Sequence, residues 1–309
     1  SGAGIEGYRN VAGYNMQKEV YSSSFSHNHD ITLNGGTDKT KVLLALNYTD
    51  DEGMKLNSYN KRIGASLKFS QKLRDNLDIA LDARYTDRRI MGSDDWTSGR
   101  GSILSSAYRF RPITSADIEA HGGNLDALKE GNYGAYSKES QWDLYNNARR
   151  IADEENLTLR QVLRSTLSLN WGIMKGLTYH TDLTLMKRWE QDKVWKGAIA
   201  NAGDYVDEDT GEKLYAGSVD YRKQDSWNMR WTNTLNYNLD ITKNQHLNIL
   251  AGHEVTNSGG TDLRIKADHF PSNFTKDNAF AMINQYDASK GVSSFSSGKS
   301  TPSRILSFF

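Results

Sequence analysis

Residues 163–185 of this 309-residue chain, LRSTLSLNWGIMKGLTYHTDLTL, give the clearest indication of its fold class. From Leu163 to Ile173, the odd-numbered residues are mostly apolar and the residues between them are polar or glycine. After Met-Lys-Gly at 174–176, the same alternation runs from Leu177 to Leu185. A period of two is typical of a β-strand with two unlike faces, and a connection this short indicates a tight hairpin.

The same pattern predicts three more hairpins, in residues 31–48, 63–85 and 227–255, which turn at 36–39, 74–76 and 242–244. The connections between hairpins are longer, and we expect long loops at about 88–159, 190–224 and 257–302. Two segments in the first loop, 116–119 and 141–155, show helical character. Strict alternation of short turns and long loops is typical of transmembrane β-barrels, in which a strand of about nine to eleven residues spans the bilayer.

The composition agrees with such a barrel and excludes several other classes. Lys and Arg number 38, as do Asp and Glu, so the chain lacks the basic excess of a nucleic-acid binder. No run approaches eighteen apolar residues, and cysteine is absent, which excludes disulfides and thiolate sites. The first ten residues lack the features of a signal peptide, so the protein is either cytoplasmic or a mature or internal piece.

Aromatic residues fall near the long-loop ends of the predicted strands. Tyr48, Tyr85, Trp189, Trp227 and Trp231 occupy such positions. We expect them to form the aromatic girdle that marks a membrane interface. The alternative is that they cap the core of a soluble β-sandwich.

Residues 27–73 carry the clearest resemblance to a known family. Gly35-Gly36-Thr37 is followed by Tyr48, an acidic Glu52-Gly53 loop and Lys61-Arg62. Further on, LNILAGHEV at 247–255 and RILSFF at 304–309 continue the series. In order and spacing these pieces resemble the barrel of SusC/RagA-type TonB-dependent outer-membrane transporters of Bacteroidetes, over residues 25–90 by motif and 160–309 by pattern.

The resemblance implies a 22-stranded antiparallel transmembrane β-barrel that is filled by an N-terminal plug. Residues 1–309 contain no plug domain and no TonB box, so we expect an internal fragment of the barrel. Its fold would be all-β, an open curved sheet of about eight to nine strands with short helices in long extracellular loops. The terminal Phe308-Phe309 leaves open the alternative of a small complete barrel.

The resemblance also implies function. The intact protein would import oligosaccharides or peptides across the cell outer membrane, without enzymatic activity or cofactors. Its partners would be a SusD-like lipoprotein, the TonB-ExbB-ExbD complex, outer-membrane lipid and the glycan or peptide substrate, with no nucleic acid. Two alternatives remain: a soluble β-rich carbohydrate-binding module and a small passive outer-membrane pore.

Candidate sites are few. Four loop aromatics could stack on a ligand, with packing of loop against loop as the alternative: Trp96, Trp142, Trp195 and Tyr205. His27 and His29 form an H-x-H pair that we interpret as lumen-facing polarity rather than a metal site. The acidic stretch 204–212 lacks calcium-loop spacing, and residues 209–212 indicate a hairpin turn. Alternation places His253 and Glu254 on opposite faces, and no G-x-S-x-G motif or catalytic carboxylate pair is present.

Overall fold

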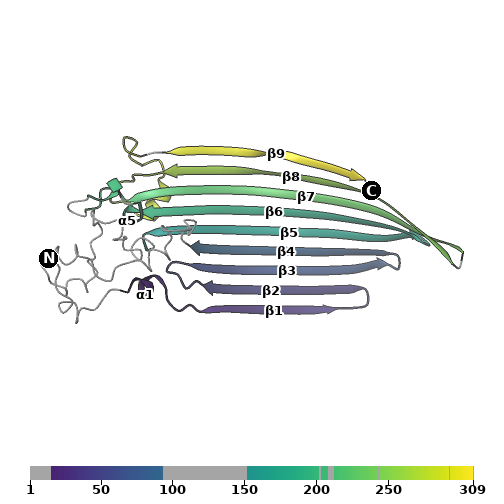
Figure 1. Cartoon of the computed structure of the whole chain (residues 1–309). Coiled ribbons are helices and arrows are strands. Elements are labelled where there is room, and N and C mark those ends of the chain that lie inside the picture. The colour runs from purple at the N-terminus through teal and green to yellow at the C-terminus, as the bar shows by residue number, and fades with distance from the viewer. Residues whose placement is uncertain are drawn as a thin grey trace.

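The computed structural model describes residues 15–92, 152–201, 203–207, 212–242, 244–291 and 293–308. Within them, nine strands form one antiparallel sheet in chain order, so the predicted fold class is confirmed (Figure 1). The strands are β1 (Ser26–Gly36), β2 (Thr40–Glu52), β3 (Tyr59–Arg74), β4 (Leu77–Gly92), β5 (Glu154–Met174), β6 (Leu177–Gly197), β7 (Gly217–Thr242), β8 (Gln245–Ala267) and β9 (Ser294–Phe308). The sheet is open, since β1 and β9 lie at its two edges.

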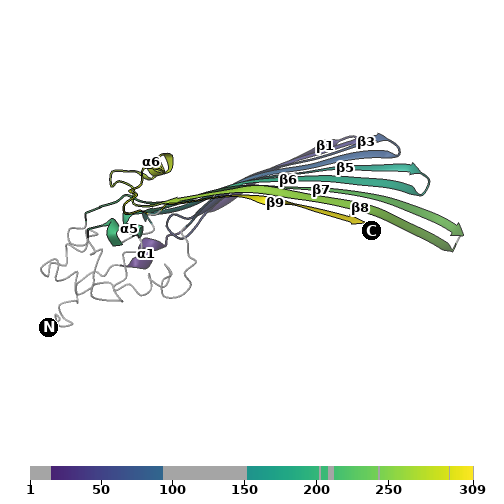
Figure 2. The same cartoon turned by 90° about the horizontal axis from the view of Figure 1, so that it is seen from above.

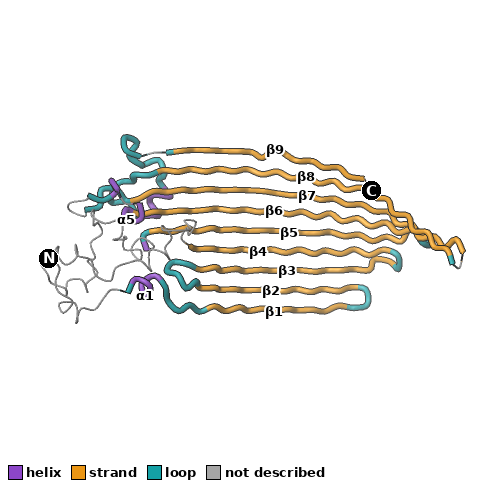
Figure 3. Tube along the Cα trace, in the orientation of Figure 1, coloured by secondary structure: helices purple, strands orange, loops and turns teal. Residues whose placement is uncertain are grey.

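The four predicted tight turns all lie at one end of the sheet, and the longer connections lie at the other (Figure 3). Two-residue or three-residue turns join β1 to β2, β3 to β4, β5 to β6 and β7 to β8. The β5–β6 turn needs Gly176, which adopts a φ of +80°, and a Cβ there would lie 2.2 Å from the Asn238 carbonyl oxygen. This glycine lets the β5–β6 hairpin turn closely beside β7.

The register gives the sheet two unlike faces. One continuous row of cross-strand partners, from β2 to β9, contains Val42, Phe69, Leu81, Leu167, Leu183, Trp231, Val255 and Leu306. The adjacent row on the opposite face contains Lys68, Asp82, Thr166, Thr184, Arg230 and Thr256. We call these the apolar face and the polar face. Leu167 is 51% exposed on the apolar face, which is the arrangement of a sheet covered by lipid.

The strands extend farther than the sequence predicted, so the expected loop boundaries 190–224 and 257–302 are wrong. β6 continues to Gly197 and β7 begins at Gly217, while β8 continues to Ala267 and β9 begins at Ser294. β7 has 26 residues, more than twice the nine to eleven that cross a bilayer. Beyond the bilayer neither face of a strand contacts lipid, so apolar and polar residues need not alternate there. The sequences of these strand ends therefore resemble those of loops. The expected loop 88–159 is shortened to 93–153, and most of it lies outside the described residues.

At the loop end, protein covers the apolar face. Trp195 of β6, Val219 of β7 and Ala267 of β8 are buried there under Phe270 and the helix α6 (Lys276–Ala281). Figure 2 shows α6 on one side of the sheet and the short helices α1 (Met16–Val20) and α5 (Ala198–Asn201) on the other. The apolar face is therefore exposed along its turn-side part and packed against the β8–β9 connection at the loop end.

Hydrogen bonds fix the two short helices on the opposite side. Asp153 accepts hydrogen bonds from the backbone N–H groups of Ile199 (2.8 Å) and Ala200 (3.1 Å) and so closes the first turn of α5. Burial raises the pKa of this carboxyl group. Val20 of α1 is fully buried, and its carbonyl accepts from the Leu56 N–H at 2.9 Å. Among the described helices, none has the length and apolar character to cross a membrane.

Candidate functional site

The outer part of the polar face is lined by paired charges. Arg222 of β7 donates to Asp262 of β8 at 2.9 Å, and Arg264 donates to Asp220 at 2.6 Å. Glu190 of β6 accepts from both Arg160 and Arg188. All of these pairs except Arg188–Glu190, which lies within β6, link neighbouring strands where the sheet rises beyond the bilayer. Together they form a hydrophilic wall.

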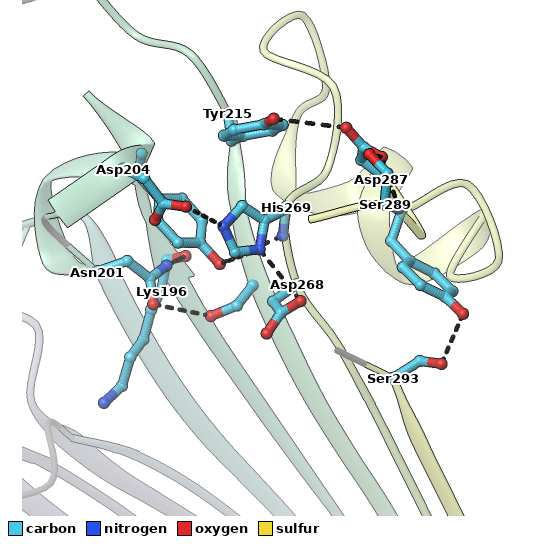
Figure 4. Close-up of polar contacts among 12 residues, drawn as sticks. Lys196, Asn201, Asp204, Tyr215, Asp268, His269, Asp287, Ser289 and Ser293 are labelled. Atoms are coloured by element: carbon cyan, nitrogen blue, oxygen red, sulfur yellow. Dashed lines mark hydrogen bonds and ion pairs between the residues drawn. The ribbon is translucent and has the colours of Figure 1, made fainter. Parts of the chain in front are cut away.

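At the loop end, His269 joins two connections that are far apart in sequence (Figure 4). Its Nε2 lies 3.1 Å from Asp204 Oδ2 in the β6–β7 connection, and its Nδ1 lies 3.2 Å from Asp268 Oδ1. The ring packs against two phenol rings, with centroid distances of 4.5 Å to Tyr205 and 4.8 Å to Tyr215. We call these five residues the histidine cluster.

The backbone supports this arrangement. His269 has a φ of +57°, in the left-handed region that few residues other than glycine adopt. Its N–H donates to Tyr205 Oη at 3.2 Å, and its carbonyl accepts from the Asp287 N–H at 3.0 Å. The Asp287 carboxylate in turn accepts from Tyr215 Oη and from Ser289, and the Ser289 bonds hold its pKa below the usual range. The β6–β7 and β8–β9 connections thus form one unit.

Burial raises the pKa of Tyr205 to about 12. Because the folded state holds this phenol neutral, its contribution to stability is complete below pH 10 and is lost between about pH 10 and 12. We expect cleavage of residues 268–293 by subtilisin to accelerate over that range. Tyr205→Phe keeps the ring but cannot ionise, so its cleavage should start slightly faster and rise less with pH. An equal pH dependence in both proteins would contradict this assignment.

Of the four aromatic residues predicted as ligand contacts, the structure describes Trp195 and Tyr205, and it places them in two different packed clusters. Trp195 is 8% exposed inside the core beneath Phe270, and Tyr205 is 6% exposed in the histidine cluster. Neither ring has a free face for a sugar, so the stacking prediction is wrong for both, and loop packing explains them. Trp96 and Trp142 lie outside the described residues.

The predicted lumen-facing position of His27 and His29 is also wrong. In β1 they share a face with Ile31, whose partner is Leu46, and His29 is paired with Tyr48. The rings of His27 and His29 lie 5.1 Å apart, and His29 stacks on Tyr48. The pair was assigned by polarity alone, whereas counting in steps of two from Ile31 places it on the apolar face.

Two other predictions concern possible metal ligands. Val206 and Lys213 pair as an antiparallel bridge, which supports a hairpin, although the turn residues 208–211 lie outside the described residues. His253 pairs with Asn233 on the apolar face, and Glu254 accepts from Thr232 on the polar face, as predicted. Within the part of the chain that the structure describes, no three His, Asp or Glu side chains are grouped to bind a metal.

The predicted girdle residues share the apolar face. Register places Tyr85 and Trp227 in one row, with Lys187 of β6 between them, and both side chains are exposed. Trp227 lies over Gly259, where a Cβ would approach the indole to 3.0 Å. These positions are compatible with a membrane interface, and the girdle itself stays a prediction.

A large antiparallel meander with one exposed apolar face and one polar face has the architecture of the wall of an outer-membrane β-barrel. No protein-family model matches the chain. Two solved structures of the RagAB peptide importer resemble it over 96% of its length. The "closed-closed" state has a TM-score of 0.72 at 16% identity, and the "open-open" state has 0.71 at 15%.

The chain is also 25% identical, over 126 residues, to the TonB-dependent receptor P3 of Formosa agariphila. It spans 31% and 30% of the two importer chains, and the match covers 13% of the receptor. The chain thus has the fold of part of a RagA-type TonB-dependent transporter barrel, and the resemblance noted in its sequence is confirmed at that level. Proteins of this class lie in the outer membrane.

Proposed function

We propose that this sheet is part of the barrel wall of an importer for oligosaccharides or peptides, driven by the TonB-ExbB-ExbD complex. The observation that supports it most directly is the continuous apolar row across eight strands, backed by a continuous polar row. In a closed barrel, such a wall separates lipid from a hydrophilic lumen. The similar RagAB structures are those of a peptide importer, which supports import as the function.

We further propose that the loop end faces a SusD-like lipoprotein lid. The packed unit of the β6–β7 and β8–β9 connections offers a rigid outer rim, because the histidine cluster and the core beneath Phe270 fix it to the sheet. A rim that keeps its shape without the lid would allow the lid to open and close repeatedly. Co-purification of an outer-membrane lipoprotein with the intact protein would support this partner.

The test of the function is uptake by cells that produce the intact protein. Fluorescent oligopeptides and oligosaccharides should enter cells that contain it, and uptake should stop when the gene for TonB is deleted. A passive pore would instead admit the cargo without TonB and would conduct ions steadily in planar bilayers. Absence of uptake for every cargo, charged or neutral, would refute the importer proposal.

A further inference from the structure

We propose that six arginines on the polar face bind the carboxylate groups of an acidic oligomeric cargo. This inference rests on the importer function and adds a substrate class to it. The residues, called the arginine patch, are Arg62 on β3, Arg84 and Arg88 on β4, Arg160 and Arg164 on β5, and Arg188 on β6. They come from four neighbouring strands, and no residue between Gly92 and Glu154 is needed to form the patch.

The register places like charges directly opposite one another. Arg62 is the cross-strand partner of Arg88, which is also the partner of Arg160. In the same way, Arg84 is the partner of Arg164. Opposed like charges destabilise a strand pair, so folding alone does not favour this arrangement. The three consecutive polar-face rows on β3–β6 hold these six arginines and one carboxylate, Glu190, which gives a formal charge of +5.

Elsewhere on the polar face, the sheet pairs arginines with carboxylates of a neighbouring strand. On β7 and β8, Arg222 is paired with Asp262, and Arg264 with Asp220. A carboxylate on a neighbouring strand satisfies each of these guanidinium groups. The excess of cations on β3–β6 is thus a local feature and not a property of the whole face.

Three members of the patch have no carboxylate partner among the described residues. Arg62 donates to the Asn47 amide oxygen at 3.0 Å, and Arg88 donates to that of Asn60 at 2.6 Å. Arg164 is exposed and makes no hydrogen bond or ion pair with any described residue. Arg84 is held by Asp82, while Arg160 and Arg188 share Glu190. Guanidinium groups of this kind are well suited to bidentate contact with carboxylates.

The position and size of the patch favour a cargo that enters from the loop end. Arg62 lies twelve residues from Arg74 at its tight turn, and Arg160 lies fourteen from Met174, so both are beyond the nine to eleven residues of a membrane span. Four strands and three rows cover an area roughly 15 Å across, which suits several linked carboxylates rather than one. A hollow at Gly64 adjoins the patch, and its lining includes Arg62 and Arg84 as well as Asp30 of β1.

The test compares acidic and neutral oligomers on the intact, detergent-purified protein. Tetraglutamate and tetragalacturonate are the acidic probes, and tetraglutamine and maltotetraose are the neutral ones. The variant is Arg62→Gln with Arg164→Gln. Its control is Arg74→Gln with Lys175→Gln, which removes two exposed cations at the turn end of the same strands. If the double variant does not assemble, the two single variants are measured instead.

We expect at least one acidic oligomer to bind, with an affinity that falls at least tenfold in the patch variant and less than twofold in the control. Binding should also weaken from 50 to 500 mM salt, because the contacts are ionic. The peptide and sugar probes show which backbone the site accepts. Neutral probes should not respond to the variant.

Two results would overturn the inference. One is that acidic oligomers bind equally to the wild type and the patch variant. The other is that no acidic oligomer binds while the patch variant lowers the thermal stability of the ligand-free protein more than the control does, which would mean that an acidic segment of the protein itself covers the arginines. In either case, continued TonB-dependent uptake of neutral cargo would leave the proposed importer function intact.

Discussion

Replacing Phe270 by alanine is expected to lower the local stability of the outer rim by about 3–5 kcal/mol, the usual cost of emptying a buried phenylalanine site. Phe270 is 0% exposed, stacks on Phe274 and lies in the core with Trp195 and Val219. Because this core lies beyond the bilayer, the spanning sheet should stay assembled. Protease cleavage of residues 268–293 should accelerate at least a hundredfold, while the heat-modifiable folded band on a gel remains.

The matched control is Phe295→Ala on β9. Phe295 is the same residue type but is 68% exposed, so its loss should change cleavage of residues 268–293 by less than about threefold. Equal cleavage of the two variants would show that the β8–β9 connection is not fixed by the Phe270 core. Loss of the folded band in Phe270→Ala alone would show that this core is needed for the whole sheet.

Placing an arginine at Leu167 is expected to cost about 2–4 kcal/mol of stability in a lipid bilayer. Leu167 is 51% exposed on the apolar face and lies seven residues from Met174, close to the middle of the expected membrane span. The guanidinium group would enter hydrocarbon with no partner nearby. Urea unfolding in liposomes measures the change directly.

The control for Leu167→Arg is the neighbouring substitution Thr166→Arg. Thr166 faces the other way and has Asp82 as its cross-strand partner, so an arginine there would meet a carboxylate. The substitution removes only the hydroxyl contact between Thr166 and Thr184, so we expect the free energy of unfolding to change by less than about 1 kcal/mol. Similar costs at both positions would contradict the assignment of the two faces.

Much of the fold could be predicted from local sequence. The hairpin at 163–185 and the three others turn where their short polar connections indicated, because a period of two directly reports which residues share a face. The limits of the strands could not be predicted in the same way. From Trp189 to Gly197, β6 carries a mixed sequence, and its strand conformation depends on pairing with β7 and on the packing of Trp195 beneath Phe270.

The candidate site was less accessible to sequence reasoning. Trp195 and Tyr205 look like exposed loop aromatics, yet contacts with segments about 65 to 75 residues away bury them. The histidine cluster has no sequence signal, since it joins Asp204 to His269. The arginine patch has no sequence signal either, because its members are scattered over four strands, and only the cross-strand register brings Arg62, Arg88 and Arg160 side by side.

Local sequence is enough to show that the chain forms two-faced antiparallel strands joined alternately by short and long connections. That result is local, because side chains alternate along every strand whatever its neighbours are. Three features are visible only in the folded sheet: how far the strands rise, which loops cover the apolar face and which charges on the polar face lie together. Those features depend on register and on contacts between distant segments, and in an antiparallel sheet one residue of slip would move every side chain to the other face.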